Sequence, residues 1–189
     1  MKIAIIDNYD SFTYNLVHII NDLLKEDVEV MRNDQVKYEY LESCSHIILS
    51  PGPGVPDEAG DLKKVIKKFG ENKKLLGVCL GHQAIAEVYG AKLINLDQVF
   101  HGKRTLMIKT TKISPLFSGV EDQFYAGRYH SWAVDDTSDT SSFDITVVDE
   151  QNKIMAMQHK FLNIYGVQFH PESIMTDCGK IILQNFINL

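Results

Sequence analysis

Short, uninterrupted apolar runs alternate with helically spaced apolar residues through the first half of the chain. Such helical spacing begins at Phe12, after Asp57 and again at Gly81. Strands alternating with helices predict a parallel sheet with helices on both faces. We expect Asp10 or Ser11 to cap the first helix and Asp57 to cap the second. The runs typical of buried strands are KIAIID (2–7), DVEVMRN (27–33), HIILS (46–50) and LLGV (75–78).

After Gly90 the pattern changes to strand-like segments separated by turn residues. A last helix is predicted from about Asp177, with Ile181, Ile182 and Phe186 buried. Together the two halves predict an α/β fold in a single domain over residues 1–189, with a central, mostly parallel sheet and an additional β-rich part. The predicted later strands are AKLINL (91–96), KRTLMIKT (103–110), DQFYAGRYHSWAV (122–134), DITVVDE (144–150), KIMAMQHK (153–160) and IYGVQFH (164–170).

Composition narrows the functions that this fold can have. The 189 residues include 19 basic and 25 acidic side chains, for a net charge of −6, and no run of Lys or Arg exceeds two. The chain therefore lacks the positive surface of a nucleic-acid or anionic-membrane binder. No apolar run is long enough to span a membrane, and MKIAIID reaches Asp7 too soon for a signal peptide. We expect a cytoplasmic protein.

Cys79 is the cysteine whose surroundings indicate chemistry. Its spacing from Cys44 and Cys178 fits neither a disulfide framework nor a zinc site. It lies in GVCLG, where a predicted strand meets a helix, and small residues two positions away on each side permit the sharp turn of a nucleophile elbow. There the helix dipole favours the thiolate, and the N–H of Leu80 points to where an oxyanion forms. The alternative is a buried structural cysteine.

A candidate base and its orienting acid follow a later predicted strand. His170 and Glu172 flank Pro171, which holds the backbone extended, so both side chains point to one side. An imidazole next to a carboxylate is suited to take the thiol proton and return it to a leaving amine. The SPGPG segment (50–54) ends another strand at the same expected edge of the sheet, where a glycine N–H would complete an oxyanion hole. A plain turn, or an exposed His and Glu, are the alternatives.

Six separated motifs, in order, resemble those of class I (triad-type) glutamine amidotransferases. More narrowly, they are similar to the small subunits that serve chorismate-using synthases: anthranilate synthase component II and aminodeoxychorismate (para-aminobenzoate) synthase component II. The resemblance covers nearly the whole chain and implies a flavodoxin-like three-layer sandwich. The motifs are DNYDSFT (7–13), SPGPG (50–54), GVCLGHQ (77–83), HGK (101–103), RYHS (128–131) and QFHPES (168–173).

The resemblance also implies a role for individual residues. Cys79 is then the nucleophile, His170 the base and Glu172 its orienting acid, and the Gly52 and Leu80 amides form the oxyanion hole. Trp132 stands where the family often has an aliphatic residue, and it would contribute through its backbone. The residues expected to bind the substrate glutamine are Gly52, Gly54, Gln83, Ser131 and Trp132.

The implied function is hydrolysis of L-glutamine with delivery of ammonia to a chorismate-binding synthase subunit (component I), for anthranilate or 4-amino-4-deoxychorismate synthesis. DNYDSFT and HGK resemble parts of the surface that contacts this partner, although helix capping and a turn at Gly102 explain them equally well. No metal or nucleotide motif is present, so we expect no cofactor in this subunit. Any need for Mg²⁺ belongs to the partner synthase subunit, and neither nucleic acid nor membrane is expected as a partner.

Two other classes of function stay open at this point. One is a Cys-His-Glu hydrolase of γ-glutamyl or peptide bonds on the same fold, because fold and triad do not determine the substrate. Gln83 and the RYHS segment favour free glutamine over such substrates. The other is a non-catalytic regulatory subunit. Such proteins usually lose the nucleophile or the base, whereas this chain retains Cys79 and His170.

Overall fold

The computed structural model describes all 189 residues and is built around one nine-stranded sheet. The first five strands in spatial order pair in parallel, and the last four continue the same sheet by antiparallel pairing. The β-rich second half therefore extends the parallel sheet. The order is β2 (Glu29–Arg32), β1 (Ile3–Asp7), β3 (His46–Leu49), β4 (Lys74–Val78), β11 (Ile164–Val167), β10 (Ile154–His159), β9 (Phe143–Asp149), β6 (Lys103–Lys109) and β7 (Gln123–Arg128).

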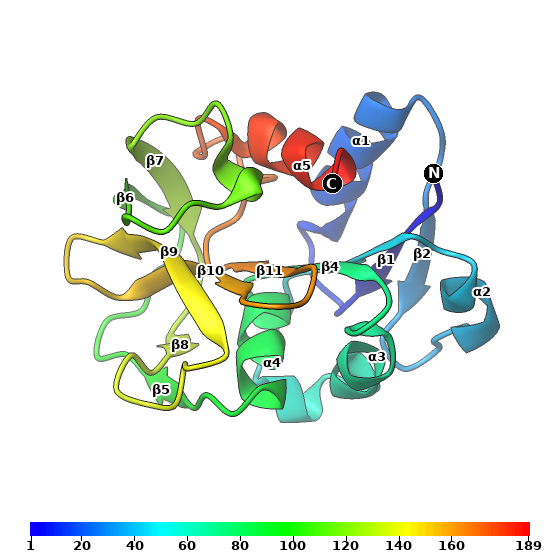
Figure 1. Ribbon diagram of the computed structural model, residues 1–189, viewed down its shortest axis with the longest axis horizontal. Helices are drawn as coiled ribbons and strands as arrows, with labels where there is room; N and C mark the ends of the chain where they lie inside the picture. Colours follow the sequence, from blue (N-terminus) through cyan, green and yellow to red (C-terminus); the bar gives the residue numbers. More distant parts are fainter.

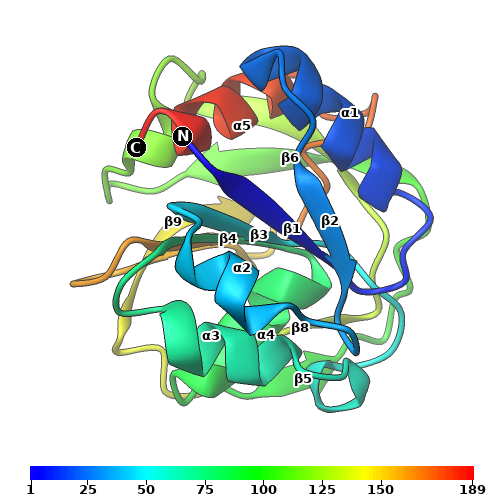
Figure 2. The same cartoon turned by 90° about the vertical axis from the view of Figure 1, so that its right-hand side faces the viewer.

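Helices cover both faces of the parallel part (Figure 1). On one face lie α1 (Thr13–Leu24) and α5 (Gly179–Ile187), and on the other lie α3 (Leu62–Phe69) and α4 (Leu80–Val88). Figure 2 shows the two helical layers above and below the strands. Their apolar sides bury Leu16, Ile20 and Phe186 on one face and Val65 and Ile85 on the other. The predicted three-layer α/β architecture is confirmed.

Shorter elements complete the structure. The helix α2 (Tyr38–Glu42) follows the edge strand β2, and single helical turns occur at η1 (Pro56–Glu58) and η2 (Pro115–Phe117). A separate two-stranded ribbon pairs β5 (Leu93–Asn95) with β8 (Trp132–Val134) in an antiparallel manner. No helix is long and apolar enough to cross a membrane.

The predicted helix caps were wrong. The first helix starts one residue after Phe12, and the Asp10 carboxylate accepts a hydrogen bond from the Phe12 N–H, in the turn that precedes the helix. Neither Asp10 nor Ser11 provides a side-chain cap. Asp57 lies inside η1, and Asp61 precedes α3. The short Asp10 side chain therefore stabilises the turn before α1, whereas the Asp57 carboxylate accepts from Nζ of Lys63.

Two predictions for the second half also needed correction. Residues 122–134 form two strands, β7 and β8, which belong to different sheets and are joined through residues 129–131. Ile181 on α5 is 44% exposed, whereas Ile182 and Phe186 are fully buried. The helix places Ile182 and Phe186 four residues apart on one face, and Ile181 lies beside that face.

Candidate active site

Cys79 occupies a sharp turn between β4 and α4. Its backbone has φ 51° and ψ −100°, a left-handed conformation that is uncommon outside glycine. A Cβ on Gly77 would lie 2.4 Å from the carbonyl carbon of Gly81, and one on Gly81 would lie 2.4 Å from the carbonyl oxygen of Leu49. Neither position accepts a side chain without movement of the backbone. The structure thus has the nucleophile elbow that the GVCLG pattern predicts.

The neighbouring parallel strand β11 brings the candidate base and its candidate orienting acid to the same edge of the sheet. Val167 on β11 pairs with Val78 on β4, and the Cys79 N–H donates to the Val167 carbonyl at 2.8 Å. His170 and Glu172 follow this strand, and Nδ1 of His170 lies 2.6 Å from Oε1 of Glu172. Both side chains are almost completely buried. The geometry is that of an oriented base beside the elbow.

The surroundings of His170 favour its charged form. Burial acts to lower the pKa of His170, but the charges of Glu172 and Cys79 outweigh it and hold this pKa well above the usual 6.5. Two aromatic rings pack edge-on against the imidazole, with centroid distances of 4.8 Å for Tyr129 and 5.9 Å for Phe12. These rings help to bury the imidazole.

The SPGPG loop lies directly against the elbow. A Cβ on Gly52 would lie 2.6 Å from both the Leu80 side chain and that of Asn8, so only glycine fits between them. Leu80 is the first residue of α4. Its N–H, like the others in the first turn of a helix, has no acceptor within the helix. The structure therefore brings Gly52 into contact with the Leu80 side chain, and these are the two residues whose amides are the candidate oxyanion donors.

A cavity of about 130 Å³ opens next to Cys79. It is lined by all five residues that we expect to bind glutamine, together with Cys79, Pro53, Tyr129 and His130. Gln83 lines the cavity, and its Nε2 donates to the Trp132 carbonyl at 2.7 Å. No group of three or more His, Cys, Asp and Glu side chains is arranged to bind a metal ion.

The DNYDSFT motif has an internal role that the sequence did not indicate. Asn8 is buried, and its Nδ2 donates to the Ser50 carbonyl at 2.7 Å while its N–H donates to Ser50 Oγ at 2.8 Å. Asp7 is also buried and accepts from the Thr13 hydroxyl at 2.9 Å. The motif thus clamps the start of the SPGPG loop. Asn8 directly following a buried strand was the available signal for this role.

Known protein families, sequences and solved structures that are similar to this chain agree with this arrangement. The family model described as "Glutamine amidotransferase class-I" matches residues 4–189 of the chain. This chain belongs to the class-I glutamine amidotransferases. A solved structure assigned to a GMP synthase component of Thermoplasma acidophilum superposes on the chain with a TM-score of 0.87 at 26% identity, covering 100% of this chain and 92% of that one.

Curated relatives of this amidotransferase carry synthase names. It is 44% identical to aminodeoxychorismate/anthranilate synthase component 2 of Bacillus subtilis, over 98% of this chain and 95% of that protein. It is also 44% identical to anthranilate synthase component 2 of Saccharolobus solfataricus, over 97% and 96%. Identity to the bifunctional protein TrpGD of Thermotoga maritima is 41% over the whole chain, which spans 32% of the length of that protein.

Buried neutral histidines make the stability of this amidotransferase sensitive to acid. Burial lowers the pKa of His46 to about 4 and that of His82 to about 3, and burial together with the charge of Arg128 lowers the pKa of His130 to about 3. In the unfolded chain these rings take up protons near pH 6.5. The unfolded state therefore binds more protons below that pH, and the free energy of unfolding falls as pH decreases from about 6.5 toward about 4.

Urea unfolding at neutral pH and near pH 5 measures this loss. His46→Leu puts an apolar side chain of similar size against Phe186 and should reduce the loss, since it removes one of the three titrating rings. Equal stability of the wild type at the two pH values would contradict the prediction. The contribution of His170 to the free energy of unfolding depends on pH in the opposite direction. Because its pKa is raised in the folded chain, it stabilises the fold below about pH 6.5, and this stability is lost as pH rises through the raised pKa.

Proposed function

We propose that this amidotransferase hydrolyses L-glutamine to glutamate and passes the ammonia to a chorismate-using synthase subunit, for anthranilate or 4-amino-4-deoxychorismate synthesis. The observation that carries the proposal is the 2.6 Å His170–Glu172 pair, which follows the strand next to the Cys79 elbow, together with the small cavity that Cys79 lines. The printed names of relatives at 44% identity support the synthase assignment.

The chemistry begins with proton transfer from Cys79 to Nε2 of His170, which has no hydrogen-bond partner within the chain. The thiolate attacks the side-chain carbonyl carbon of glutamine, and the resulting oxyanion accepts hydrogen bonds from the Gly52 and Leu80 amides. Imidazolium then protonates the amine. The C–N bond breaks, ammonia leaves, and a glutamyl thioester remains on Cys79.

Water completes the cycle. His170 takes a proton from a water molecule while the oxygen of that water attacks the thioester carbonyl. Collapse of the tetrahedral intermediate then breaks the C–S bond and releases glutamate. Glu172 keeps the Nδ1 proton of His170 in place and stabilises the imidazolium in both halves of the reaction. Because free ammonia in neutral water is mostly ammonium, which is not nucleophilic, direct transfer to the acceptor protein is chemically favoured.

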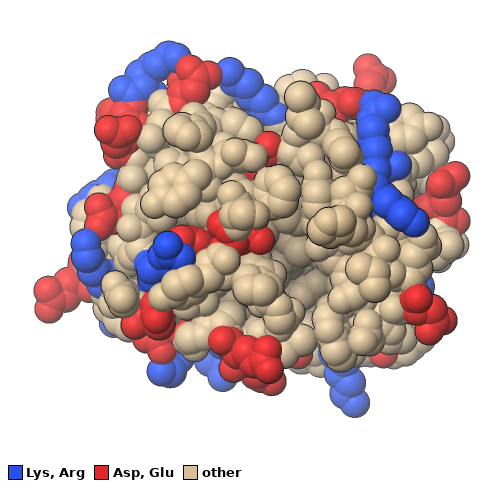
Figure 3. Space-filling model, turned by 180° about the vertical axis from the view of Figure 1, so that it is seen from behind, with Lys and Arg blue, Asp and Glu red and all other residues tan.

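Exposed apolar side chains near the site offer a surface for this partner. Tyr9 and Tyr14 are about half exposed, beside or within the DNYDSFT motif, Val99 is exposed just before HGK, and Ile174 is fully exposed after QFHPES. In Figure 3 the face toward which the parallel strands point has a central hollow surrounded mostly by uncharged atoms. An apolar surface at the mouth of the site would let a partner seal it from water.

The test is glutamate release by the purified chain, alone and with an anthranilate-type or an aminodeoxychorismate-type large subunit plus chorismate. Stimulation by one partner identifies the acceptor chemistry, and stimulation by both identifies a shared glutaminase. Absence of glutamate release under every condition would overturn the proposal. Release from γ-glutamyl peptides in its place would identify the alternative hydrolase.

Glu172→Gln is expected to retain part of the activity. The amide oxygen can still accept from Nδ1 of His170, but it no longer provides the charge that stabilises the imidazolium. We expect kcat for glutamate release to fall about 100-fold, a smaller loss than removal of the nucleophile causes. Steady-state kinetics with glutamine measure this change. Activity equal to that of wild type would show that Glu172 does not support the base.

A further inference from the structure

Gln168 lies next to the Cys79 side chain and has no part in the mechanism described above. It directly follows β11, and the pairing of Val167 with Val78 places it beside Cys79. Its side chain is fully buried, and Nε2 is 3.6 Å from Sγ of Cys79, within hydrogen-bond distance for sulfur. A buried carboxamide in contact with the reacting sulfur offers an N–H donor to the thiolate.

Hydrogen bonds on its other side determine which way this carboxamide points. Nε2 of Gln83 donates one hydrogen to the Trp132 carbonyl at 2.7 Å and lies 3.1 Å from Oε1 of Gln168. Because a carbonyl only accepts, the NH₂ group of Gln83, and not its oxygen, faces Trp132. The Gln168 atom next to this NH₂ group must then be an acceptor, which is its oxygen. The oxygen of Gln168 therefore faces Gln83, and its NH₂ group faces the sulfur.

The Trp132 carbonyl is held in turn by His130, which is itself bonded to the buried side chain of Arg128. Arg128 Nε donates to Nε2 of His130 at 3.0 Å, so the ring hydrogen is on Nδ1, which lies 2.8 Å from the Trp132 carbonyl. Burial and the charge of Arg128 lower the pKa of His130 to about 3, which keeps the ring neutral and Nε2 free to accept. Because a guanidinium only donates, Arg128 sets the direction of its bond to His130 and therefore of the bond from His130 to the Trp132 carbonyl.

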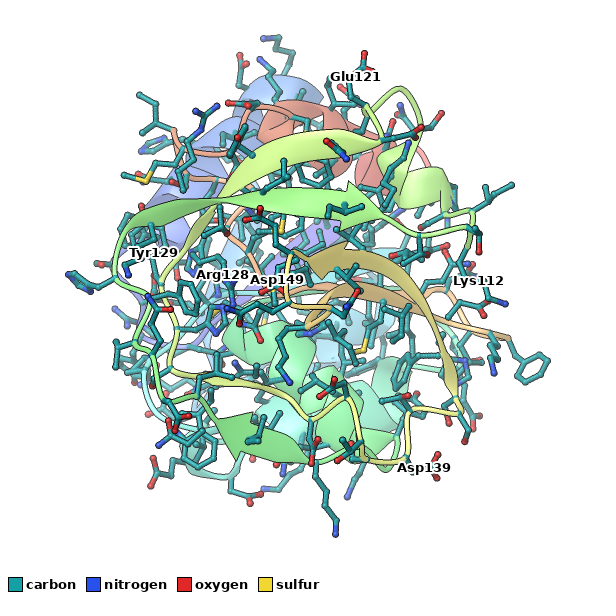
Figure 4. All side chains as sticks on the ribbon, turned by 90° about the vertical axis from the view of Figure 1, so that its left-hand side faces the viewer. Lys112, Glu121, Arg128, Tyr129, Asp139 and Asp149 are labelled. Carbon is teal, nitrogen blue, oxygen red and sulfur yellow. The ribbon has the colours of Figure 1, made fainter.

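Arg128 itself is held rigidly. Its side chain is 2% exposed, bonds to Asp149 at 2.8 Å and stacks on the Phe100 ring at 3.6 Å. Figure 4 shows Arg128 and Asp149 side by side in the interior. An ion pair of this kind adds little net stability, because desolvation of the two charges offsets their attraction. It does give the hydrogen-bond chain a fixed starting point.

We propose that Gln168 is a catalytic residue, whose Nε2–H stabilises the Cys79 thiolate, and that Arg128, His130 and Gln83 are positioning residues that orient it. This inference rests on the proposed glutaminase function. In the step concerned, the S–H bond of Cys79 breaks, its proton moves to Nε2 of His170, and the electron pair stays on sulfur, where the Gln168 N–H meets it. The same contact supports the thiolate when it leaves the thioester.

The test measures alkylation of Cys79 by iodoacetamide without glutamine or partner, with the adduct located by mass spectrometry. Gln168→Met removes the donor at similar volume, and we expect the alkylation rate constant near pH 7 to fall about fivefold. The pH of half-maximal rate should also move upward. Gln158→Met is the matched control, because Gln158 on β10 donates to the Ile113 carbonyl at the surface and should leave the rate unchanged.

Further variants separate the donor from its positioning. Gln168→Asn keeps a carboxamide that is one methylene too short to reach the sulfur, and it should slow alkylation even if Gln168→Met does not fold. His130→Phe retains the stacking on Phe100 but removes both ring nitrogens, so it should lower the rate to a smaller extent and raise KM for glutamine. Circular dichroism verifies folding of each variant.

The outcomes distinguish this inference from the proposed function. Wild-type alkylation rates and pH profiles in folded Gln168→Met or Gln168→Asn would overturn the role of Gln168. Slower alkylation in both variants would support it, even if the wild-type chain released no glutamate from glutamine. In that second case the proposed function alone would fail.

Discussion

Replacement of Cys79 by serine should lower kcat/KM for glutamate release by at least about 1,000-fold, the largest loss of activity that we expect from a single substitution. A serine hydroxyl is far less acidic than a thiol, and His170 is arranged to pair with a thiolate. Oxygen is smaller than sulfur, so the change adds no clash and leaves almost no cavity. Folding, glutamine binding and association with a synthase partner should all persist.

Three measurements test this prediction. Coupled glutamate dehydrogenase kinetics give the activity, calorimetric titration with glutamine gives binding, and urea unfolding gives stability. Cys44→Ser serves as a control, because Cys44 is a buried thiol shortly before β3, at the opposite end of the parallel strands, and contributes no group to the cavity. Glutamate release at the wild-type rate by Cys79→Ser would remove Cys79 from the mechanism.

Gly77→Ala should have the largest effect on folding, with a loss of about 3 kcal/mol or more in the free energy of unfolding. The new methyl group would lie 2.4 Å from the carbonyl carbon of Gly81 and 2.6 Å from the His82 amide nitrogen. Both are backbone atoms at the start of α4, so the helix must shift away from β4. That shift moves the Leu80 amide, and activity should fall in any molecules that still fold.

Gly119→Ala is the matched control for this substitution. Gly119 has a φ of 73° and nothing within 4 Å of an added Cβ, so alanine there meets only the backbone preference, a cost of about 1 kcal/mol. Urea unfolding of both variants separates steric conflict from lost backbone freedom. If the two substitutions cost the same, the close contact between the strand and helix at the elbow is not what requires glycine at position 77.

Local patterns in the sequence predicted the fold, and the structure brings the candidate reacting groups to one edge of the sheet. Uninterrupted apolar runs indicate strands buried on both faces, and the alternation with helices fixes the layers. The turn at Cys79 follows from the glycines beside it, and the placement of His170 next to Glu172 follows from Pro171 between them. Each of these inferences depends on residues within a few positions of one another.

Features that depend on distant segments could not be predicted in this way. The helix caps failed because the Asp10 carboxylate bonds within the turn before α1 and Asp57 lies inside a separate helical turn before α3. Asn8 and Gln168 are polar residues directly after apolar strands, and their partners, Ser50 and Cys79, lie far away in the chain. Only the strand order of the folded sheet brings these side chains together.

The position of β11 makes completion of the sheet a late event in folding. This strand lies between β4 and β10, and its pairing with β4 joins Ile164 to Leu75, about ninety residues earlier. During synthesis both neighbours remain open edges until β11 leaves the ribosome, and open edges invite aggregation. Because His170 lies shortly after the end of β11, the step that closes the sheet also brings this candidate base to Cys79, so partly folded chains should be unable to consume glutamine.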